Sequence, residues 1–324
     1  MPDQQNGRAA APVSQLARRL AAGEFALTAE ITPPVSGTAQ VLLEKAMPLK
    51  GHLDAVNMTD GASARVHMSS VASAAILAAN GIEPIAQFTC RDRNRIALMS
   101  DLLGASALGV QNLLMLTGDD PTMGDQPDAK PVFDLSSIDL IALAAAMSTD
   151  GLLPSFGGKP REGLPPATRP IDGPPNFFVG AADMPTEEAT DRWRDGLRAK
   201  IDAGARFLQT QVCYDLDVVR RYAALLRAEG FADSVSVLIS NGPLASARSA
   251  IWMRENLWGV LIPDDIVARL EQADDPKAEG IEICREQILA VAEIPGIAGA
   301  HMIAPTNPTS VPEALVGLAI PGRT

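Results

Sequence analysis

Aromatic residues are scarce in this chain: Phe, Trp and Tyr together make up only 4% of its 324 residues. Proteins that bind single-stranded nucleic acid stack the bases on aromatic side chains, so this composition argues against that function. The formal net charge of -12 also disfavours binding to a nucleic acid or an anionic membrane surface. We therefore expect neither a nucleic acid nor a membrane as the main partner.

Cysteine is also rare. Cys90, Cys213 and Cys284 lie far apart without a CxxC pair, and the three histidines are scattered, so the sequence predicts no metal site and no disulfide framework. No run of eighteen apolar residues occurs, and the N-terminus lacks a signal-peptide core. We expect a cytoplasmic protein whose cysteines are reduced and packed in the core.

Apolar residues are abundant, at 47%, and the stretch 112–121, NLLMLTGDDP, shows how they are used. A continuous apolar run that ends in turn residues is typical of a strand buried on both faces. The turn places Asp119 and Asp120 at the carboxyl end of the strand, where parallel α/β proteins bind ligands. The alternative is that an aspartate only caps the next helix.

Eight units of strand followed by helix can be traced along the chain. Their alternation predicts a parallel sheet, and a count of eight allows it to close, so we expect a single-domain (β/α)8 TIM barrel over 23–324. Residues 1–22 are expected to form a lead and a short helix. The expected strands are 26–32, 53–58, 83–88, 112–117, 176–181, 205–211, 235–240 and 298–304.

The expected helices lie between these strands, with extra helical segments over 244–294 and Asp92 as the cap of the helix that ends near 103. A Pro/Gly-rich stretch at 150–175 precedes strand five and is interpreted as an ordered loop or lid, or alternatively as a disordered insertion. The competing fold is an open, doubly wound sheet, but no GxGxxG and no Walker loop is present.

If the barrel closes, the residues at the strand ends form a polar ring with few titratable members. Amides and carboxylates of this kind match the edge of a pterin, flavin or purine. No Ser-His-Asp signature is present, so redox or one-carbon chemistry with an organic cofactor is favoured over hydrolysis. The ring comprises Glu30, Thr59, Gln87, Thr89, Asp119, Gln211, Asn241 and Asn307.

Five short motifs follow one another in a characteristic order. They are AEITPP at 29–34, VNMT at 56–59, FTCRDRN at 88–94, NLLMLTGD at 112–119, and KIDAGA at 200–205 with QTQ at 209–211. In sequence, order and spacing they resemble the methylenetetrahydrofolate reductase family over about residues 24 to 310.

The resemblance implies an oxidoreductase of one-carbon metabolism and methionine biosynthesis, which reduces 5,10-methylenetetrahydrofolate to 5-methyltetrahydrofolate. NADH or NADPH would be the reductant, through FAD bound at the barrel mouth. Glu30 would be the general acid that helps to open the five-membered ring, and its apolar surroundings would raise its pKa. An ion pair of Glu30 with a cation on a neighbouring strand is the alternative. Asp119 would hold the amino-pyrimidine edge of the pterin.

Other positions match binding residues of the family. Gln211, Thr28 and Leu244 would contact the folate substrate. For Lys200 a solvated position at a helix end is an equal alternative. The expected flavin contacts are Thr59, Gln87, Thr117, Gly118 and Lys200.

Three positions depart from the family pattern: Gln87 replaces a flavin-facing His, Thr117 replaces an Arg, and Ala181 or Ala182 stands where a Tyr is usual after strand five. Hydride transfer from NADH to folate without flavin is therefore an alternative. A pterin-binding methyl or one-carbon transferase on the same barrel, and a silent binding subunit, are the others. The family implies homo-oligomers, and one subgroup implies a partner subunit of a one-carbon redox complex, while exposed Trp252 and Trp258 could contribute an interface.

Overall fold

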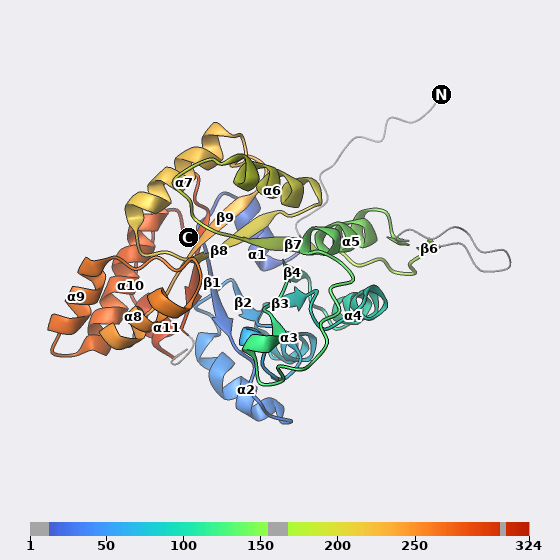
Figure 1. Cartoon of the computed structure of the whole chain (residues 1–324), viewed down its shortest axis with the longest axis horizontal. Helices are drawn as coiled ribbons and strands as arrows, with labels where there is room; N and C mark the ends of the chain where they lie inside the picture. Colours follow the sequence, from blue (N-terminus) through green and yellow to red (C-terminus); the bar gives the residue numbers. More distant parts are fainter. Residues whose placement is uncertain (1–12, 155–167, 305–308, 324) are drawn as a thin grey trace.

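The computed structural model describes residues 13–154, 168–304 and 309–323. Eight parallel strands close into a barrel, in the order β1-β2-β3-β4-β7-β8-β9-β10, which confirms the predicted (β/α)8 fold (Figure 1). Each strand pairs with its neighbours in parallel register, and β10 pairs with β1 to close the ring. The strands are β1 (Ala26–Ile31), β2 (Ala55–Met58), β3 (Pro84–Thr89), β4 (Asn112–Leu116), β7 (Phe178–Asp183), β8 (Phe207–Val212), β9 (Ser236–Asn241) and β10 (Gly299–Ile303).

Helices surround the barrel and cover the outward faces of the strands (Figure 1). The expected helical region 244–294 resolves into three helices, which pack with Val212 at the end of β8 and Ile303 at the end of β10. The helices are α2 (Ala39–Ala46), α3 (Ser70–Ala79), α4 (Arg95–Ala107), α5 (Ser137–Thr149), α6 (Asp191–Asp202), α7 (Leu216–Ala228), α8 (Ala247–Asn256), α9 (Asp264–Gln272), α10 (Pro276–Ala292) and α11 (Ser310–Leu315).

The start of α4 differs from the sequence-based expectation. The side chain of Asn94 accepts hydrogen bonds from the backbone N–H groups of Ile96 and Ala97, so Asn94 is the N-cap. Asp92 was the wrong choice, because its carboxylate binds the guanidinium of Arg91 instead. Both residue types are good caps, and only the tertiary partner distinguishes them here.

A further helix, α1 (Gln15–Ala21), closes the amino end of the barrel. Its Leu16 and Leu20 pack against residues near the starts of the strands, including Ala26 and Phe207. The ring of Phe207 fills the position where a side chain on Gly180 would otherwise point, because a Cβ there would lie 2.3 Å from the ring. Large and small residues thus interdigitate inside the barrel, as close packing requires.

Buried ion pairs also stabilise the amino end of the barrel. Asp54 is 1% exposed and lies just before β2. Its carboxylate binds Arg19 of α1 and Arg323 near the C-terminus, each at 2.6 Å, and accepts the backbone N–H of Leu27 at 2.7 Å. Three distant parts of the chain are therefore joined through one carboxylate.

The Pro/Gly-rich stretch before β7 carries a short antiparallel ribbon, β5 (Leu152–Leu153) with β6 (Arg169–Pro170). The middle of that stretch, 155–167, lies outside the described residues, so its expected role as a lid stays a prediction.

Candidate functional site

Glu30 lies near the carboxyl end of β1 and is half-buried. Its Oε2 accepts a hydrogen bond of 2.9 Å from Nε2 of Gln87, two strands away on β3. Burial raises the pKa of Glu30 from 4.5 to about 7, and the hydrogen bond from Gln87 opposes that rise. Among the described residues no Lys, Arg or His lies within ion-pair distance of Glu30, which removes the ion-pair alternative. The barrel thus holds an acid that carries a proton near neutral pH.

A layer of four buried polar side chains lies one step deeper in the barrel. Gln209 donates from Nε2 to Thr28 and to Asn57, both at 3.1 Å, and its Oε1 accepts from Asn57 at 2.6 Å. Thr28 Oγ1 lies 2.9 Å from Nδ1 of His301, and desolvation lowers the pKa of His301 to about 3, so this imidazole is neutral. The layer forms a polar floor beneath Glu30.

Sequence reasoning missed this layer as a unit. It placed His301 inside a strand and proposed Thr28 as a substrate contact, but Thr28 is fully buried and its hydroxyl binds Gln209 and His301. One signal was available. Thr28, Asn57 and Gln209 each lie two residues before a predicted site residue at a strand end. Because side chains alternate along a strand, each of them shares the inward face with that site residue.

The turn after β4 separates the two aspartates. Asp120 accepts from the backbone N–H of Thr122 at 2.9 Å and so caps the short helix η3 (Pro121–Met123). Asp119 is exposed at the rim; its backbone oxygen accepts from Arg91 at 3.4 Å, and its carboxylate has no hydrogen-bond partner in the described part of the chain. The cap interpretation therefore holds for Asp120, while the side chain of Asp119 is accessible to a ligand.

Gly118 allows this turn. Its φ is +96°, which is strained for residues with a Cβ, and an added Cβ would lie 3.0 Å from Cβ of Arg91 and 3.1 Å from Cβ of Thr89. Next to it Thr117 is exposed. The glycine thus brings the turn close to the end of β3.

The remaining predicted contacts fall into two groups. Thr59, after β2, is 3% exposed, and its Oγ1 is buried without a hydrogen-bond partner among the described residues. Gln211 on β8 is engaged by the backbone: its Nε2 donates to the carbonyl of Trp258 at 2.9 Å, and its Oε1 accepts from Val212 at 2.9 Å. Both lie at the carboxyl ends of barrel strands, as predicted.

Leu244 and Lys200 lie elsewhere. Leu244 is 3% exposed and packs in the cluster formed by α8, α9 and α10. The ammonium group of Lys200 donates to the carbonyl of Ala182 at 2.7 Å and lies 3.3 Å from the carboxylate of Asp183. The ammonium group of Lys200 is thus bound by protein oxygens while the side chain stays 23% exposed. Its proposed flavin contact, like that of Leu244 with folate, stays a prediction.

Two members of the expected polar ring are not seen at the mouth. Asn241 is fully buried, with both polar atoms of its amide unpaired among the described residues. Asn307 lies outside the described part of the chain.

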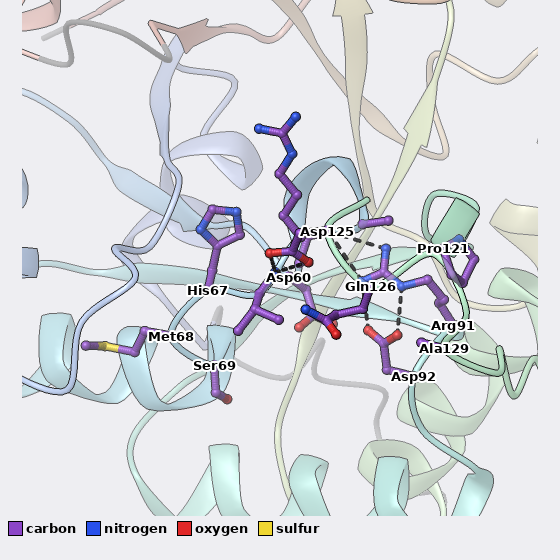
Figure 2. Close-up of a pocket in the computed structure, with 14 residues that line it drawn as sticks. Asp60, His67, Met68, Ser69, Arg91, Asp92, Pro121, Asp125, Gln126 and Ala129 are labelled. Atoms are coloured by element: carbon purple, nitrogen blue, oxygen red, sulfur yellow. Dashed lines mark hydrogen bonds and ion pairs between the residues drawn. The ribbon is translucent and has the colours of Figure 1, made fainter. Parts of the chain in front are cut away.

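Beside the mouth, the loops after β2, β3 and β4 enclose a pocket of about 270 Å³ (Figure 2). Arg91 lies in its wall and binds both oxygens of Asp92, each at 2.7 Å. Ser63 and Ala64 have φ of 55° and 54°, and Gly124 packs so closely that a Cβ would lie 1.8 Å from the carbonyl oxygen of Ala64. Glu30 does not line this pocket, and sequence reasoning did not foresee it.

His, Cys, Asp and Glu side chains of the described residues nowhere gather in threes that could hold a metal ion. Within those same residues, no helix is long and apolar enough to cross a membrane. The fold and site define a (β/α)8 barrel whose carboxyl-end mouth holds a glutamate with a raised pKa above a polar floor.

Comparison with known proteins specifies the family. The family model described as methylenetetrahydrofolate reductase matches residues 15–316, so the chain belongs to this family. A search of curated proteins finds no significant match.

One solved structure supports the fold. An uncharacterized protein from Clostridium thermocellum, described as binding two copies of 5-methyl-5,6,7,8-tetrahydrofolic acid, aligns with a TM-score of 0.62 at 13% identity, over 93% of this chain and 98% of that one. The aminoacrylate-bound tryptophan synthase from M. tuberculosis aligns with a TM-score of 0.43 at 11% identity, over 83% and 98% of the two chains. The second alignment is too weak to bear on function.

Proposed function

We propose that this protein reduces 5,10-methylenetetrahydrofolate to 5-methyltetrahydrofolate with NADH or NADPH. Membership of the methylenetetrahydrofolate reductase family supports the reaction, and the Clostridium thermocellum neighbour is described with the product of this reaction bound. The observation that carries the proposal is Glu30, an acid at the barrel mouth whose pKa of about 7 keeps a proton available at neutral pH.

The chemistry requires such a group. In the reduction, the bond between N10 and the methylene carbon breaks, a hydride adds to that carbon, and N10 gains a proton. Glu30 supplies this proton, since a general acid works best when its pKa lies near the working pH. Asp119, exposed at the end of β4, accepts hydrogen bonds from the amino-pyrimidine edge of the pterin.

Gln211 is the second proposed folate ligand. Its amide now donates to the carbonyl of Trp258, and one N–H of the same NH₂ group is left to donate to the substrate. Folate binding therefore need not break the contact with Trp258.

FAD is the cofactor that the family implies, and the mouth fits its ring system in part. The buried hydroxyl of Thr59, after β2, lacks a partner among the described residues, and Thr117, after β4, is exposed. A bound flavin would supply hydride transfer between NAD(P)H and folate. Lys200 and Gln87, however, are already bonded to Asp183 and Glu30. This observation favours the flavin-independent reaction as the second candidate.

The test begins with the visible spectrum of the purified protein, followed by NADH oxidation with methylenetetrahydrofolate or menadione as acceptor. Glu30→Gln should lower the rate with folate by about 10²- to 10⁴-fold, the usual contribution of a general acid, and spare the reaction with menadione. Glu44→Gln, on the exposed face of α2, is the control.

Three outcomes decide among the candidates. A colourless protein that reduces folate with NADH would select the flavin-independent reaction. Folate binding without any NAD(P)H oxidation would replace the proposal by a pterin-dependent transferase. Loss of menadione reduction with intact folate reduction in Glu30→Gln would show that the acid is assigned to the wrong step.

A further inference from the structure

The hydrogen bond between Gln87 and Glu30 is asymmetric. Nε2 of Gln87 donates to Oε2 of Glu30 at 2.9 Å, whereas Oε1 of Glu30 has no hydrogen-bond partner among the described residues. Oε1 is nevertheless not sealed in the core, because Glu30 is only half-buried and this oxygen is absent from the buried unpaired atoms of the described chain. The two oxygens of the acid are therefore chemically distinct.

Gln87 is itself held firmly. It is 6% exposed in the middle of β3, and its backbone oxygen accepts from the hydroxyl of Ser70, at the start of α3, at 2.8 Å. A buried amide on a barrel strand loses little further conformational freedom when it binds a carboxylate, so the contact is preorganised.

We propose that Gln87 is a positioning residue for Glu30, which holds Oε2 as an acceptor and so places the transferable proton on Oε1. A proton on Oε2 would face an N–H donor, which offers it no acceptor. On Oε1 it faces the open side of the site. The proposal deepens the function proposed above and gives Gln87 a role other than contact with flavin.

Among the described residues, no charged side chain forms an ion pair with Glu30. Its register partners on the adjacent strands are Asn57 on β2 and Ile303 on β10, which do not titrate, and His301, one layer deeper beside Thr28, is neutral. The shift in the pKa of Glu30 has two causes, desolvation and the bond from Gln87. Removing the amide of Gln87 should therefore change the pKa of Glu30 through the loss of this hydrogen bond.

The experiment titrates the protonated carboxyl band of Glu30 by infrared difference spectroscopy, with Glu30→Gln to identify the band. Gln87→Met keeps the length of the side chain but has no N–H. Loss of one hydrogen bond to a carboxylate should move the midpoint upward by about one to two pH units. Gln87→Asn, whose amide is too short to reach, should move it in the same direction and serves if the methionine variant does not fold.

Gln40→Met is the matched control, because Gln40 of α2 also donates to a glutamate, Glu44 at 3.3 Å, but on the exposed surface. It should leave the midpoint unchanged. An unchanged midpoint in both Gln87 variants would overturn the proposal. So would a downward shift, since it would mean that the amide accepts from the protonated acid.

A second readout is enzymatic. If the protein reduces folate, the alkaline limb of kcat/KM should move upward in Gln87→Met by the same interval as the infrared midpoint, since the acid stays protonated to higher pH. The infrared titration needs no substrate, so absence of folate reduction would refute the proposed function while leaving the role of Gln87 to be decided separately.

Discussion

Replacing Glu30 by Gln should stabilise the protein, and the gain should grow with pH. The pKa of Glu30 is 4.5 in an ordinary setting and about 7 in the folded barrel. Between these values the folded state keeps a proton that the unfolded chain has released, so the stability of the wild type falls as pH rises. Glutamine has no such proton and can still accept the hydrogen bond from Gln87.

The magnitude follows from the shift. The pKa difference of about 2.5 corresponds to about 3 kcal/mol, because one pKa unit is worth about 1.4 kcal/mol. The difference in unfolding free energy between Glu30→Gln and wild type should therefore rise by about 3 kcal/mol from pH 4.5 to pH 8. Most of the change should fall between pH 5 and pH 7, and little should follow above pH 8.

Urea unfolding at several pH values, followed by circular dichroism, measures this difference. Glu44→Gln on the exposed face of α2 controls for the loss of one surface charge. A stability difference that stays constant from pH 5 to pH 8 would refute the claim that burial raises the pKa of Glu30. The expected outcome is a stability difference that grows with pH, because the wild type keeps a buried acid at a cost in unfolding free energy.

Three further predictions test other parts of the molecule. Asp54→Ala should lower the unfolding free energy by about 2 to 4 kcal/mol in urea titrations, because two arginines lose their buried partner. The control Asp264→Ala, which removes the exposed ion pair with Arg254, should lower it by less than about 1 kcal/mol. Gly180→Ala should destabilise by more than about 1 kcal/mol, since its Cβ would meet a phenyl ring at 2.3 Å, whereas Gly104→Ala in α4 has open space and should not destabilise. Asp119→Asn should weaken folate binding about tenfold in a fluorescence titration, because a charged acceptor becomes neutral; unchanged affinity would remove Asp119 from the site.

Much of the fold could be read from local patterns. Continuous apolar runs such as 112–117, each followed by turn residues, marked the barrel strands because strands buried on both faces need apolar side chains on both. Helix ends were less predictable. The pattern of residues 66–80 predicts a helix over the whole stretch, but α3 begins only at Ser70.

The sequence by itself determined the barrel, the family and the position of Glu30, because the alternation of strands and helices along the chain, the motifs, and the place of a residue within its strand are all readable from neighbouring residues. Only the tertiary structure decided which partners those residues have. It paired Lys200 with Asp183 and Gln87 with Glu30, and it buried Leu244. Such pairings join residues 17 to 57 positions apart, and a hydrogen bond depends on distances of a few tenths of an ångström that no local pattern specifies.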